Sequence, residues 1–389
     1  MKHTFASRYK QVAGPVYLDC NATAPMEPAV REAVTQWLAE ELGNAGSRTH
    51  EYGLRAKKAV QAARDQIAAV VDAAADEVIF TSGATESNNL AILGLAAHGG
   101  ESQRRHIVST AIEHKAVLEP LEALEARGFS VTLVRPDANG VVTAEAVRAA
   151  IRPDTLLVSV MHANNETGSI QPLLDIANAI EGHEAYFHVD AAQGYGKDLE
   201  PLRSKRIDLI SVSGHKIYGP VGVGALIIRR RGFKRPPLTP LTFGGGQERG
   251  LRPGTLPVPL IVGLGVAAET ALKDHEARRE RCRDIRRQAL AALEPLGIRM
   301  HSDPDQTLPH VMNFSVPGVD SEAVMVALKD VAAVSNGSAC TSQSYTPSHV
   351  LQAMELPREA VSGAIRVSWS HLTPDVDWPL LASRIEALS

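Results

Sequence analysis

The sequence predicts an α/β protein with a mostly parallel, seven-stranded sheet in one large domain and a second, small α+β domain. Between about residues 77 and 230, seven short runs rich in Val and Ile alternate with longer helical stretches. These runs are apolar on both faces, which is typical of a parallel sheet covered by helices on both sides. Beyond a long charged helical stretch, the strands and helices become shorter and their order changes.

Each of the seven runs is expected to form one strand of the large sheet. An amphipathic helix is predicted before them at Ala56–Val71, because Ala59, Ala63, Ile67 and Val70 recur at helical spacing. The predicted strands are Val78–Thr81, Ile107–Thr110, Val131–Arg135, Leu156–Met161, Tyr186–Val189, Leu209–Val212 and Ala225–Ile228.

The pattern of strands and helices in the C-terminal third of the chain predicts a second domain. One helical segment around Leu264–Leu293 is expected to lead out of the first domain. We therefore predict a large domain over residues 17–266 and a small domain formed by residues 1–16 and 267–389. The elements expected after the helical segment are a strand at Val311–Val316, a helix at Ser321–Leu328, a strand at Val331–Val334, a helix at Val350–Met354 and a strand at Ile365–Trp369.

Composition excludes several classes of protein. The 389 residues are 44% hydrophobic and 22% charged, which argues against disorder and against a fibrous architecture. The net charge of −4 disfavours a nucleic-acid-binding module. We interpret the basic runs Arg229–Arg231 and Arg278–Arg281 as solvated surface, with a partner-binding patch as the alternative.

The sequence also indicates a compartment. It shows neither a signal peptide nor an apolar run of membrane-spanning length, so a cytoplasmic protein without membrane contact is expected. The three cysteines, Cys20, Cys282 and Cys340, are too few and too scattered for a disulfide framework or a metal cluster. In a reducing compartment, one of them can remain a reactive thiol.

The segment from Phe80 to Asn88 follows a predicted strand and opens a helix. Gly83 permits a tight turn, after which the amides and the Thr85 hydroxyl can point at an anion on the helix N-terminus. The alternative is an ordinary N-cap followed by Glu86. This segment therefore predicts a phosphate-binding site only in combination with the other residues described below.

Two further strand ends supply an acid and an amine. Asp190 ends a buried-looking strand, where a carboxylate can keep a pyridine nitrogen protonated; the alternative is a helix N-cap. Lys216 follows the next strand in a segment with Ser213 and His215, and its amine can condense with an aldehyde. An isolated lysine near a glycine is more often exposed, but one that ends an apolar strand is less often so.

Three more residues fit the same cleft. His114 follows another predicted strand and can lie flat on a cofactor ring, although a solvated loop histidine is an equal alternative. Asn165 can meet both a ring oxygen and a substrate carboxylate, unless this asparagine-rich strand end is only a turn. Cys340 has small polar neighbours, which predict an exposed loop rather than the burial that is general for cysteine.

Seven segments, taken together and in order, resemble the cysteine desulfurases, which are fold-type-I pyridoxal-phosphate enzymes of the aminotransferase class V branch. Each segment alone is a weak signal, whereas seven at workable spacing are specific. The resemblance covers the chain from Tyr17 to about Leu372. The segments are TSGATESNN, EHKAV, NNETG, HVDAAQ, SGHKIYGP, GGGQERGLRPGTLP and SNGSACTS.

The resemblance implies a set of site residues for pyridoxal 5'-phosphate. Lys216 would hold the cofactor covalently, Asp190 would pair with the ring nitrogen, Gln193 would face the ring hydroxyl and His114 would stack on the ring. Thr255 would reach the phosphate of a neighbouring subunit, which implies a homodimer. The phosphate would be held by Ala84, Thr85, Ser213 and His215, and the substrate carboxylate by Asn165 and Arg366.

The implied reaction removes sulfur from L-cysteine. Lys216 would move the α-proton, His114 would carry the proton of the substrate thiol, and the Cys340 thiolate would take the sulfur as a persulfide while L-alanine leaves. Cys20, where the family usually has Tyr or Asn, and Cys282 would be bystanders. A transaminase, a selenocysteine lyase or a scaffold without catalysis are the alternatives, and the segment SACTS favours a desulfurase.

The destination of the sulfur is a narrower inference. Residues 337–354 and 365–378 are most similar to the desulfurase of DNA phosphorothioation systems, and the chain stops at Ser389 without the scaffold-docking extension of housekeeping members. We therefore expect an iron–sulfur protein as sulfur acceptor and no direct contact with DNA. Housekeeping iron–sulfur cluster assembly, nitrogenase maturation and tRNA thiolation remain the alternatives.

Overall fold

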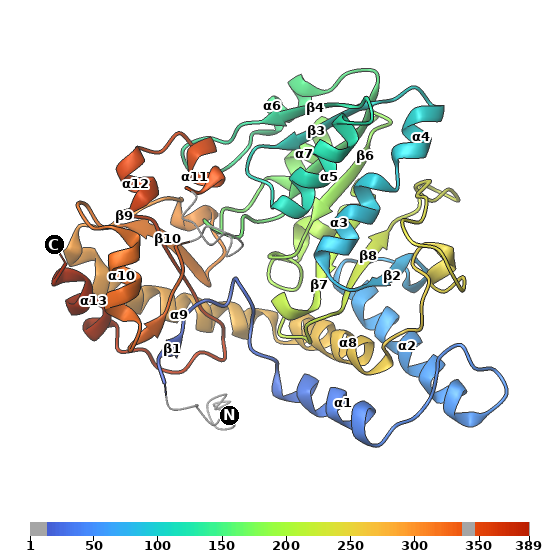
Figure 1. The fold of residues 1–389 in the computed structure, drawn as a ribbon, viewed down its shortest axis with the longest axis horizontal. Helices are drawn as coiled ribbons and strands as arrows, with labels where there is room; N and C mark the ends of the chain where they lie inside the picture. The colour runs from blue at the N-terminus through green and yellow to red at the C-terminus, as the bar shows by residue number, and fades with distance from the viewer. Residues whose placement is uncertain (1–13, 337–346, 389) are drawn as a thin grey trace.

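The computed structural model describes residues 14–336 and 347–388, and its central element is a seven-stranded sheet (Figure 1). All neighbouring strands are parallel except for β8, which is antiparallel to both of its neighbours. The prediction of a mostly parallel sheet is confirmed, and each predicted strand ends within one residue of its expected position. In spatial order the strands are β2 Val78–Thr81, β8 Gly224–Ile228, β7 Leu209–Ser213, β6 Tyr186–Asp190, β5 Thr155–Met161, β3 His106–Thr110 and β4 Ser130–Val134.

Helices cover both faces of this sheet, which explains why the strand runs are apolar on both sides. In β8, Ala225 and Ile227 pack with α1, α2 and α8, whereas Leu226 and Ile228 pack on the other face with α3 and α5. Each face thus receives alternate residues of the same strand. The helices before the small sheet are α1 Pro28–Ala39, α2 Glu51–Val70, α3 Ala84–Leu93, α4 Ala96–Glu101, α5 Lys115–Glu125, α6 Ala144–Ala150, α7 Leu173–Ala179 and α8 Val258–Lys273.

Helix α2 begins five residues earlier than the hydrophobic periodicity predicts. Its N-cap is His50, whose ring Nδ1 accepts a hydrogen bond of 3.1 Å from the backbone N–H of Gly53. A histidine cap satisfies one of the free amides of the first turn, but histidine is not among the preferred capping residues. The start of this helix was therefore missed.

The predicted single helix around Leu264–Leu293 is two helices, α8 and α9 His275–Leu293 (Figure 1). Between them Asp274 has φ −103° and ψ 14°, which lies outside helical geometry. The ring Nε2 of His275 donates a hydrogen bond of 2.9 Å to the carbonyl of Lys197 and so fixes the start of α9. The prediction was wrong here because a long-range contact, not local propensity, breaks the helix.

The second unit has its own core and two small sheets. β10 Val311–Ser315 lies between β12 Ile365–Ser368 and β9 Arg299–Met300, while β1 Val16–Tyr17 pairs with β11 Ala332–Ala333. Leu18 also packs in this core, one residue after the start predicted for the large domain. The division at 16/17 and 266/267 therefore stays a prediction. The remaining helices are α10 Ser321–Leu328, α11 His349–Ala353, α12 Arg358–Ser362 and α13 Trp378–Glu386.

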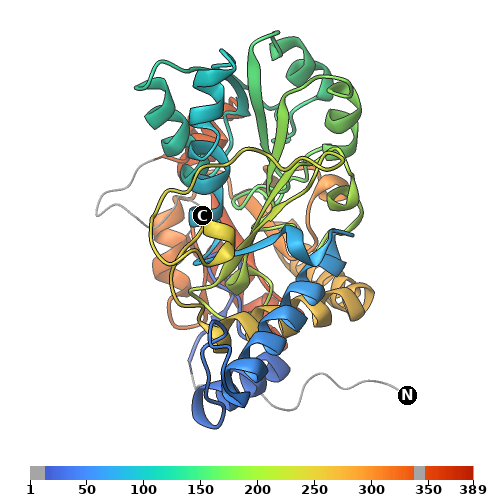
Figure 2. The ribbon, with the colours of Figure 1, turned by 90° about the vertical axis from the view of Figure 1, so that its right-hand side faces the viewer.

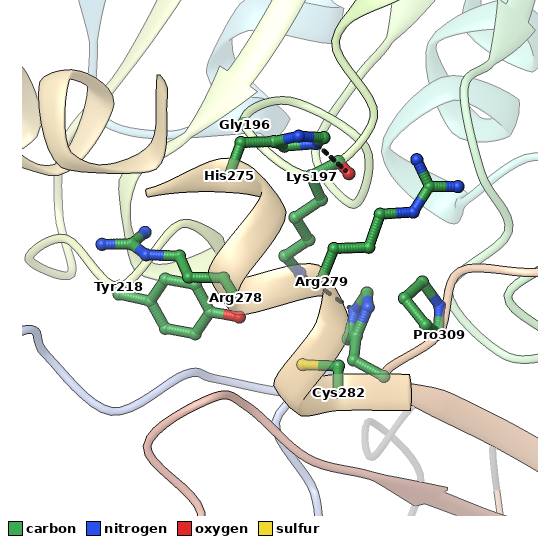
Figure 3. Close-up of a pocket in the computed structure, with 9 residues that line it drawn as sticks. Gly196, Lys197, Tyr218, His275, Arg278, Arg279, Cys282 and Pro309 are labelled. Atoms are coloured by element: carbon green, nitrogen blue, oxygen red, sulfur yellow. Dashed lines mark hydrogen bonds between the residues drawn. The ribbon is translucent and has the colours of Figure 1, made fainter. Parts of the chain in front are cut away.

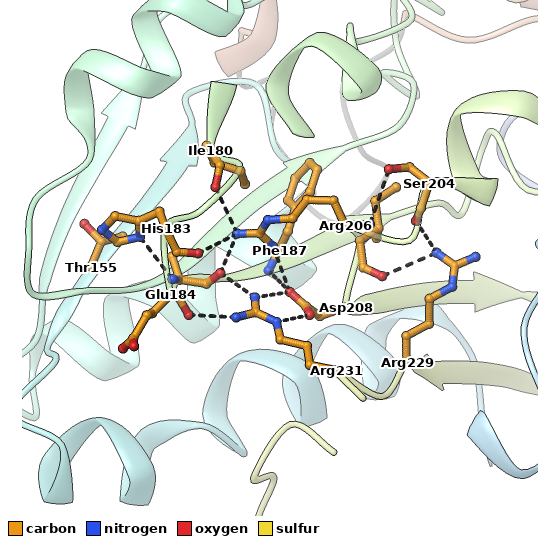
Figure 4. Close-up of polar contacts among 12 residues, drawn as sticks. Thr155, Ile180, His183, Glu184, Phe187, Ser204, Arg206, Asp208, Arg229 and Arg231 are labelled. Atoms are coloured by element: carbon orange, nitrogen blue, oxygen red, sulfur yellow. Dashed lines mark hydrogen bonds and ion pairs between the residues drawn. The ribbon is translucent and has the colours of Figure 1, made fainter. Parts of the chain in front are cut away.

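The amino-terminal edge of the large sheet is closed by a buried ion network (Figure 4). Asp208, directly before β7, is 2% exposed and accepts hydrogen bonds from Arg231 Nε at 2.6 Å and Arg231 Nη2 at 2.7 Å. The same carboxylate accepts from Arg206 and from the backbone N–H of Phe187. Arg229 nearby donates to four backbone carbonyls, three within residues 202–207, among them Ser204 at 2.8 Å, and one at Val71. This edge is therefore cross-linked by arginines.

The segment between β8 and α8 runs along the outside of the molecule, in yellow in Figure 2. It is fastened at Glu248, which is 5% exposed, forms an ion pair with Arg64 of α2 and accepts a hydrogen bond of 2.7 Å from the Phe80 N–H of β2. A second ion pair, of 2.9 Å, joins Arg252 to Glu86 in the first turn of α3. The two ion pairs bring this segment next to the start of α3.

Candidate active site

A cavity of about 550 Å³ lies at the carboxyl-terminal edge of the central sheet. Thr255 is exposed and does not line it, and Cys340 lies outside the described residues. The other ten predicted site residues all line the cavity: Ala84, Thr85, His114, Asn165, Asp190, Gln193, Ser213, His215, Lys216 and Arg366. The carboxyl ends of parallel strands meet at one edge, so residues far apart in the sequence meet there.

Lys216 reaches into this cavity from a short turn, Gly214–Lys216, directly after β7. Its Nζ donates hydrogen bonds to the backbone carbonyls of Asn21 and, at 2.7 Å, of Ala22. Burial is the main cause that lowers the pKa of this amine to about 7, and the positive charge of Lys197 lowers it further. A substantial fraction of Lys216 is then uncharged near neutral pH, as a nucleophilic amine requires.

Asp190 ends β6 and presents its carboxylate to the same cavity. Its Oδ2 accepts a hydrogen bond of 2.8 Å from Asn88 Nδ2, and its Oδ1 accepts one of 3.0 Å from the Ala192 N–H. Asn88 lies on α3, one helical turn after Ala84, and is fully buried. This asparagine stands in the segment TSGATESNN, but sequence reasoning did not assign it a role, although a polar residue on the inward face of a helix was a usable signal.

The first turn of α3 is shaped by two glycines that face each other. Gly83 has φ 155° and ψ −177°, a backbone conformation that side chains rarely adopt. On β8, a Cβ at Gly224 would lie 2.6 Å from the Cα of Gly83. Both positions therefore need glycine, and together they leave the amides of Ala84 and Thr85 at the cavity wall. This arrangement fits an anion at the helix N-terminus.

His114 is the N-cap of α5 and also lines the cavity. Its Nδ1 accepts a hydrogen bond of 3.1 Å from the Ala116 N–H, which places the ring proton of the neutral form on Nε2. Burial lowers the pKa of His114, although the charge of Asp190 opposes this. The ring is therefore neutral near pH 7 and can exchange a proton through Nε2.

Arg366, which is predicted to bind the substrate carboxylate, already has a carboxylate partner that the sequence did not predict. Its Nη2 forms an ion pair of 2.6 Å with Asp19, and its Nη1 donates to the carbonyl of Asn165 at 3.0 Å. Arg366 Nε is buried and has no partner among the described residues. The guanidinium is thus held at the cavity wall with part of its hydrogen-bonding capacity unused.

Asn21 joins several parts of the site although no motif singled it out. Its carbonyl accepts from Lys216 and from Gln193 Nε2 at 3.0 Å, and its Nδ2 donates to the carbonyl of Asn165 at 3.0 Å. The oxygens Asn21 Oδ1 and Gln193 Oε1 are buried without hydrogen-bond partners among the described residues. Such orphaned oxygens are rare in folded proteins, and here both residues line the cavity.

The two described cysteines do not supply a thiolate. Cys20 and Cys282 are 3% and 4% exposed, and burial raises the pKa of each thiol to about 12. Neither lines the large cavity. Both thiols therefore stay protonated at neutral pH and are poor nucleophiles.

The described residues that flank positions 337–346, among which Cys340 falls, contact residues at or next to the cavity. Before these positions, Ser335 and Arg366 pair through their backbones. After them, Ser348 donates a hydrogen bond of 2.5 Å to Glu166 Oε2. His349 donates one of 2.9 Å to the carbonyl of Glu113. Arg366 lines the cavity, and Glu166 and Glu113 are sequence neighbours of the lining residues Asn165 and His114.

The site thus combines an amine that is partly uncharged near neutral pH, a carboxylate, a neutral imidazole and a helix N-terminus suited to an anion. An amine that can condense with an aldehyde, opposite a carboxylate that can pair with a ring nitrogen, suits a pyridoxal-type cofactor. Among the described helices, none is long and apolar enough to cross a lipid bilayer.

Comparison with known proteins agrees with a site for a pyridoxal-type cofactor. Residues 16–377 match the aminotransferase class-V family. The chain is 43% identical over 366 residues to cysteine desulfurase IscS of Vibrio cholerae, an alignment that covers 93% of this chain and 90% of the relative.

Two solved structures are also similar. DndA from Streptomyces lividans is 52% identical and superposes with a TM-score of 0.80 over 91% of this chain and 99% of the other. SspA in complex with cysteine is 37% identical, again with a TM-score of 0.80, over 93% and 99% of the two chains.

Proposed function

This chain belongs to the aminotransferase class-V family and is a cysteine desulfurase that depends on pyridoxal phosphate, and we propose that Lys216 holds the cofactor, that Cys340 receives the sulfur, and that the sulfur serves DNA phosphorothioation. The observation that carries the assignment of the site is the meeting of Lys216 and Asp190 in one cavity.

The residues of the cavity fit pyridoxal phosphate. The orphaned oxygen of Gln193 is a partner for the ring hydroxyl, which is a hydrogen-bond donor. The carboxylate of Asp190 would hold a proton at the ring nitrogen, and Asn88 and the Ala192 amide fix its orientation. The amides at the start of α3, with Thr85, Ser213 and His215, are available to the phosphate.

When bound, pyridoxal phosphate supplies an electron-withdrawing ring that stabilises the charge left when a proton leaves the α-carbon of L-cysteine. Lys216 Nζ, with its pKa near 7, would move that proton. His114 would take or give the proton of the substrate thiol at Nε2, since Nδ1 is engaged by the Ala116 amide.

The sulfur transfer itself requires a thiolate at Cys340. Its sulfur would form a new S–S bond with the substrate sulfur while the substrate C–S bond breaks. The electron pair of the broken bond stays on the carbon, which takes up a proton and leaves as L-alanine. Because burial keeps Cys20 and Cys282 protonated, neither competes for this role.

Arg366 would bind the carboxylate of L-cysteine together with Asn165. The guanidinium is planar and can engage two carboxylate oxygens at once. Its present partner, Asp19, would share it with the substrate, and the unpaired Nε offers a further donor. We infer that the Asp19 ion pair keeps Arg366 oriented before the substrate arrives.

A homodimer is part of the proposal. Thr255 is exposed at the outer segment and does not line the cavity of its own chain, so it is free to reach a second one. Large apolar side chains are also exposed in and around α1 and the start of α2, and in the segment between β8 and α8 that carries Thr255. They are Leu38, Leu42, Tyr52, Leu54, Leu241 and Phe243.

One finding supports the narrower assignment to DNA phosphorothioation, and a second feature of the sequence does not bear on it. DndA, a phosphorothioation desulfurase, is 52% identical to this chain, against 43% for IscS. The segment Val367–His371 also departs from housekeeping desulfurases, and it is buried: Trp369 is fully inaccessible and donates a hydrogen bond of 3.0 Å to the Cys282 carbonyl. This departure therefore lies in the core and not on a surface that an acceptor protein could touch.

The sulfur-accepting role is tested with Cys340→Ser and, as matched control, Cys282→Ser. Incubated with sulfur-labelled L-cysteine, the wild type and the control should carry label on the protein, and Cys340→Ser should retain the cofactor absorbance but carry none. Label on the Cys340→Ser variant would reject the assignment of Cys340.

The pathway is tested by deleting the gene in its host. Phosphorothioate linkages in DNA, measured by mass spectrometry after nuclease digestion, should disappear, while thiolated tRNA and iron–sulfur enzyme activities persist. The reverse pattern would assign the chain to housekeeping sulfur supply.

A further inference from the structure

A second, small cavity opens at the start of α9 (Figure 3) and shares no lining residue with the large cavity. Five of its nine lining residues are Lys, Arg or His, and none is Asp or Glu. Its volume is about 30 Å³, room for about two water-sized spheres. The cationic lining residues are Lys197, His275, Arg278, Arg279 and His310.

The fold gathers these cations from three parts of the chain. His275, Arg278 and Arg279 lie on one face of the first turn of α9, because residues three and four apart share a helix face. Lys197 follows β6 and reaches α9 from the side, as Figure 3 shows. His310 stands directly before β10.

Arg278 has hydrogen-bond donors to spare. Its side chain is 8% exposed, and Nη2 forms an ion pair of 3.1 Å with Glu27. Glu27 also accepts from His371 at 3.0 Å, so this carboxylate is shared between two partners. The Nε and Nη1 of Arg278 are buried without a hydrogen-bond partner among the described residues. Its guanidinium lies 5.4 Å from the centre of the Tyr218 ring.

Lys197 makes no ion pair among the described residues. Its Nζ donates to His310 Nε2 at 3.1 Å, and His310 is a neutral acceptor because burial lowers its pKa well below the ordinary value. Burial lowers the pKa of Lys197 itself to about 8, so the amine is still mostly protonated at pH 7. The nearest acid in the sequence, Asp198, is engaged by His162 at 2.9 Å.

We propose that this cavity binds one monatomic anion of the size of chloride, held between Lys197 and Arg278. A buried charge without a counter-charge is costly, and an anion here would compensate the ammonium and accept the spare N–H groups of Arg278. The small volume favours a monatomic ion over a tetrahedral oxyanion such as phosphate. The site is separate from the cavity that holds Lys216 and does not depend on the proposed pathway.

The position of the ion is tested by diffraction from crystals of the holoenzyme grown in bromide. An anomalous peak in the cavity, within hydrogen-bonding reach of Lys197 Nζ and Arg278, is expected. A cavity that holds only water in bromide, or a peak confined to the protein surface, would overturn the proposal.

The affinity is tested in solution by exchanging gluconate for chloride at constant ionic strength. The unfolding midpoint of the holoenzyme should rise linearly with the logarithm of chloride concentration above the dissociation constant. This slope should vanish in Lys197→Met and persist in Arg281→Gln, a control on the same helix whose side chain pairs with Asp375 instead. Phosphate in place of chloride should give no slope.

Two outcomes of the solution experiment count against the site. Equal slopes in wild type and Lys197→Met would show that chloride acts elsewhere, and no slope in the wild type would show that nothing binds. If Lys197→Met fails to fold, Arg278→Lys replaces it, because this variant keeps the charge and removes the Nε and Nη1 donors. It should bind chloride at least tenfold more weakly, and an unchanged affinity would contradict the proposed contacts.

Discussion

Two buried aspartates lie at opposite ends of neighbouring strands in one sheet, and they have different roles. Asp190 ends β6 at the carboxyl edge, and Asp208 precedes β7 at the amino edge; they are 5% and 2% exposed. Phe187, which donates to Asp208, lies only three residues before Asp190, about 10 Å along the strand. Their sequence surroundings are alike, since each adjoins an apolar β-strand.

Their partners separate them. Asp208 is saturated by two arginines, one of them bidentate, and by a backbone amide. Within the described part of the chain, Asp190 is held only by an asparagine amide and a backbone amide, without an arginine, and it faces a cavity. Buried polar groups that are fully satisfied stabilise a unique structure, whereas unsatisfied ones near a cavity indicate room for a ligand. The two aspartates are therefore similarly buried, and they differ in how much hydrogen-bonding capacity each has left for a ligand.

The largest effect is expected for Asp190→Asn. At an effective dielectric constant of about 20 a close charge pair is worth about 4 kcal/mol, which corresponds to roughly a thousandfold in turnover. Alanine formation from L-cysteine should fall by about this factor, while the cofactor absorbance and the urea midpoint stay close to those of the wild type. Activity within a few-fold of the wild type would remove Asp190 from the mechanism.

The second-largest effect is expected for Asp208→Asn, and it should lower the stability of the protein and leave its activity unchanged. Asp208→Asn removes the counter-charge of Arg206 and Arg231 and should lower the free energy of unfolding by about 3 kcal/mol, at the low end for a buried pair because Arg231 is partly exposed. Urea unfolding measures this loss. The control Asp76→Asn breaks partly exposed ion pairs and should cost under about 1 kcal/mol.

If Asp208→Asn abolished turnover but left stability intact, the two edges would not differ as described.

The smallest effect is expected in the pH dependence of cofactor uptake by the apoenzyme. Lys216 reacts with the cofactor aldehyde only when uncharged, so cofactor uptake by the apoenzyme should be slow below pH 7 and rise through a midpoint near the lowered pKa, about 7. Stopped-flow absorbance measures the rate. In Lys197→Met the midpoint should move upward, because a positive charge that lowers the pKa of Lys216 is gone. A midpoint near 10 in the wild type would show that burial does not act on this amine.

Much of the fold and the candidate site could be predicted from local patterns. The strand runs and the residues that end them, such as Asp190 and Lys216, follow from periodicity of apolar residues and from strand-end positions. Asn21, Asn88 and Asp19 were missed, because their partners lie 347 residues away in the pair Asp19–Arg366 and 102 residues away in the pair Asn88–Asp190. Tertiary packing determines such contacts, and among these three residues only Asn88 had a local signal, as a polar residue on the inward face of a helix.

By itself, the sequence determined which side chains stand at the ends of which strands, because side-chain alternation and strand length are local properties of the chain. Only the tertiary structure decided which of these side chains keep unused hydrogen-bonding capacity, and so where a ligand can bind. Saturation depends on neighbours brought together by packing. Three arginines close one edge of the sheet. At the other edge, the buried oxygens Asn21 Oδ1, Asn88 Oδ1 and Gln193 Oε1 have no hydrogen-bond partner among the described residues.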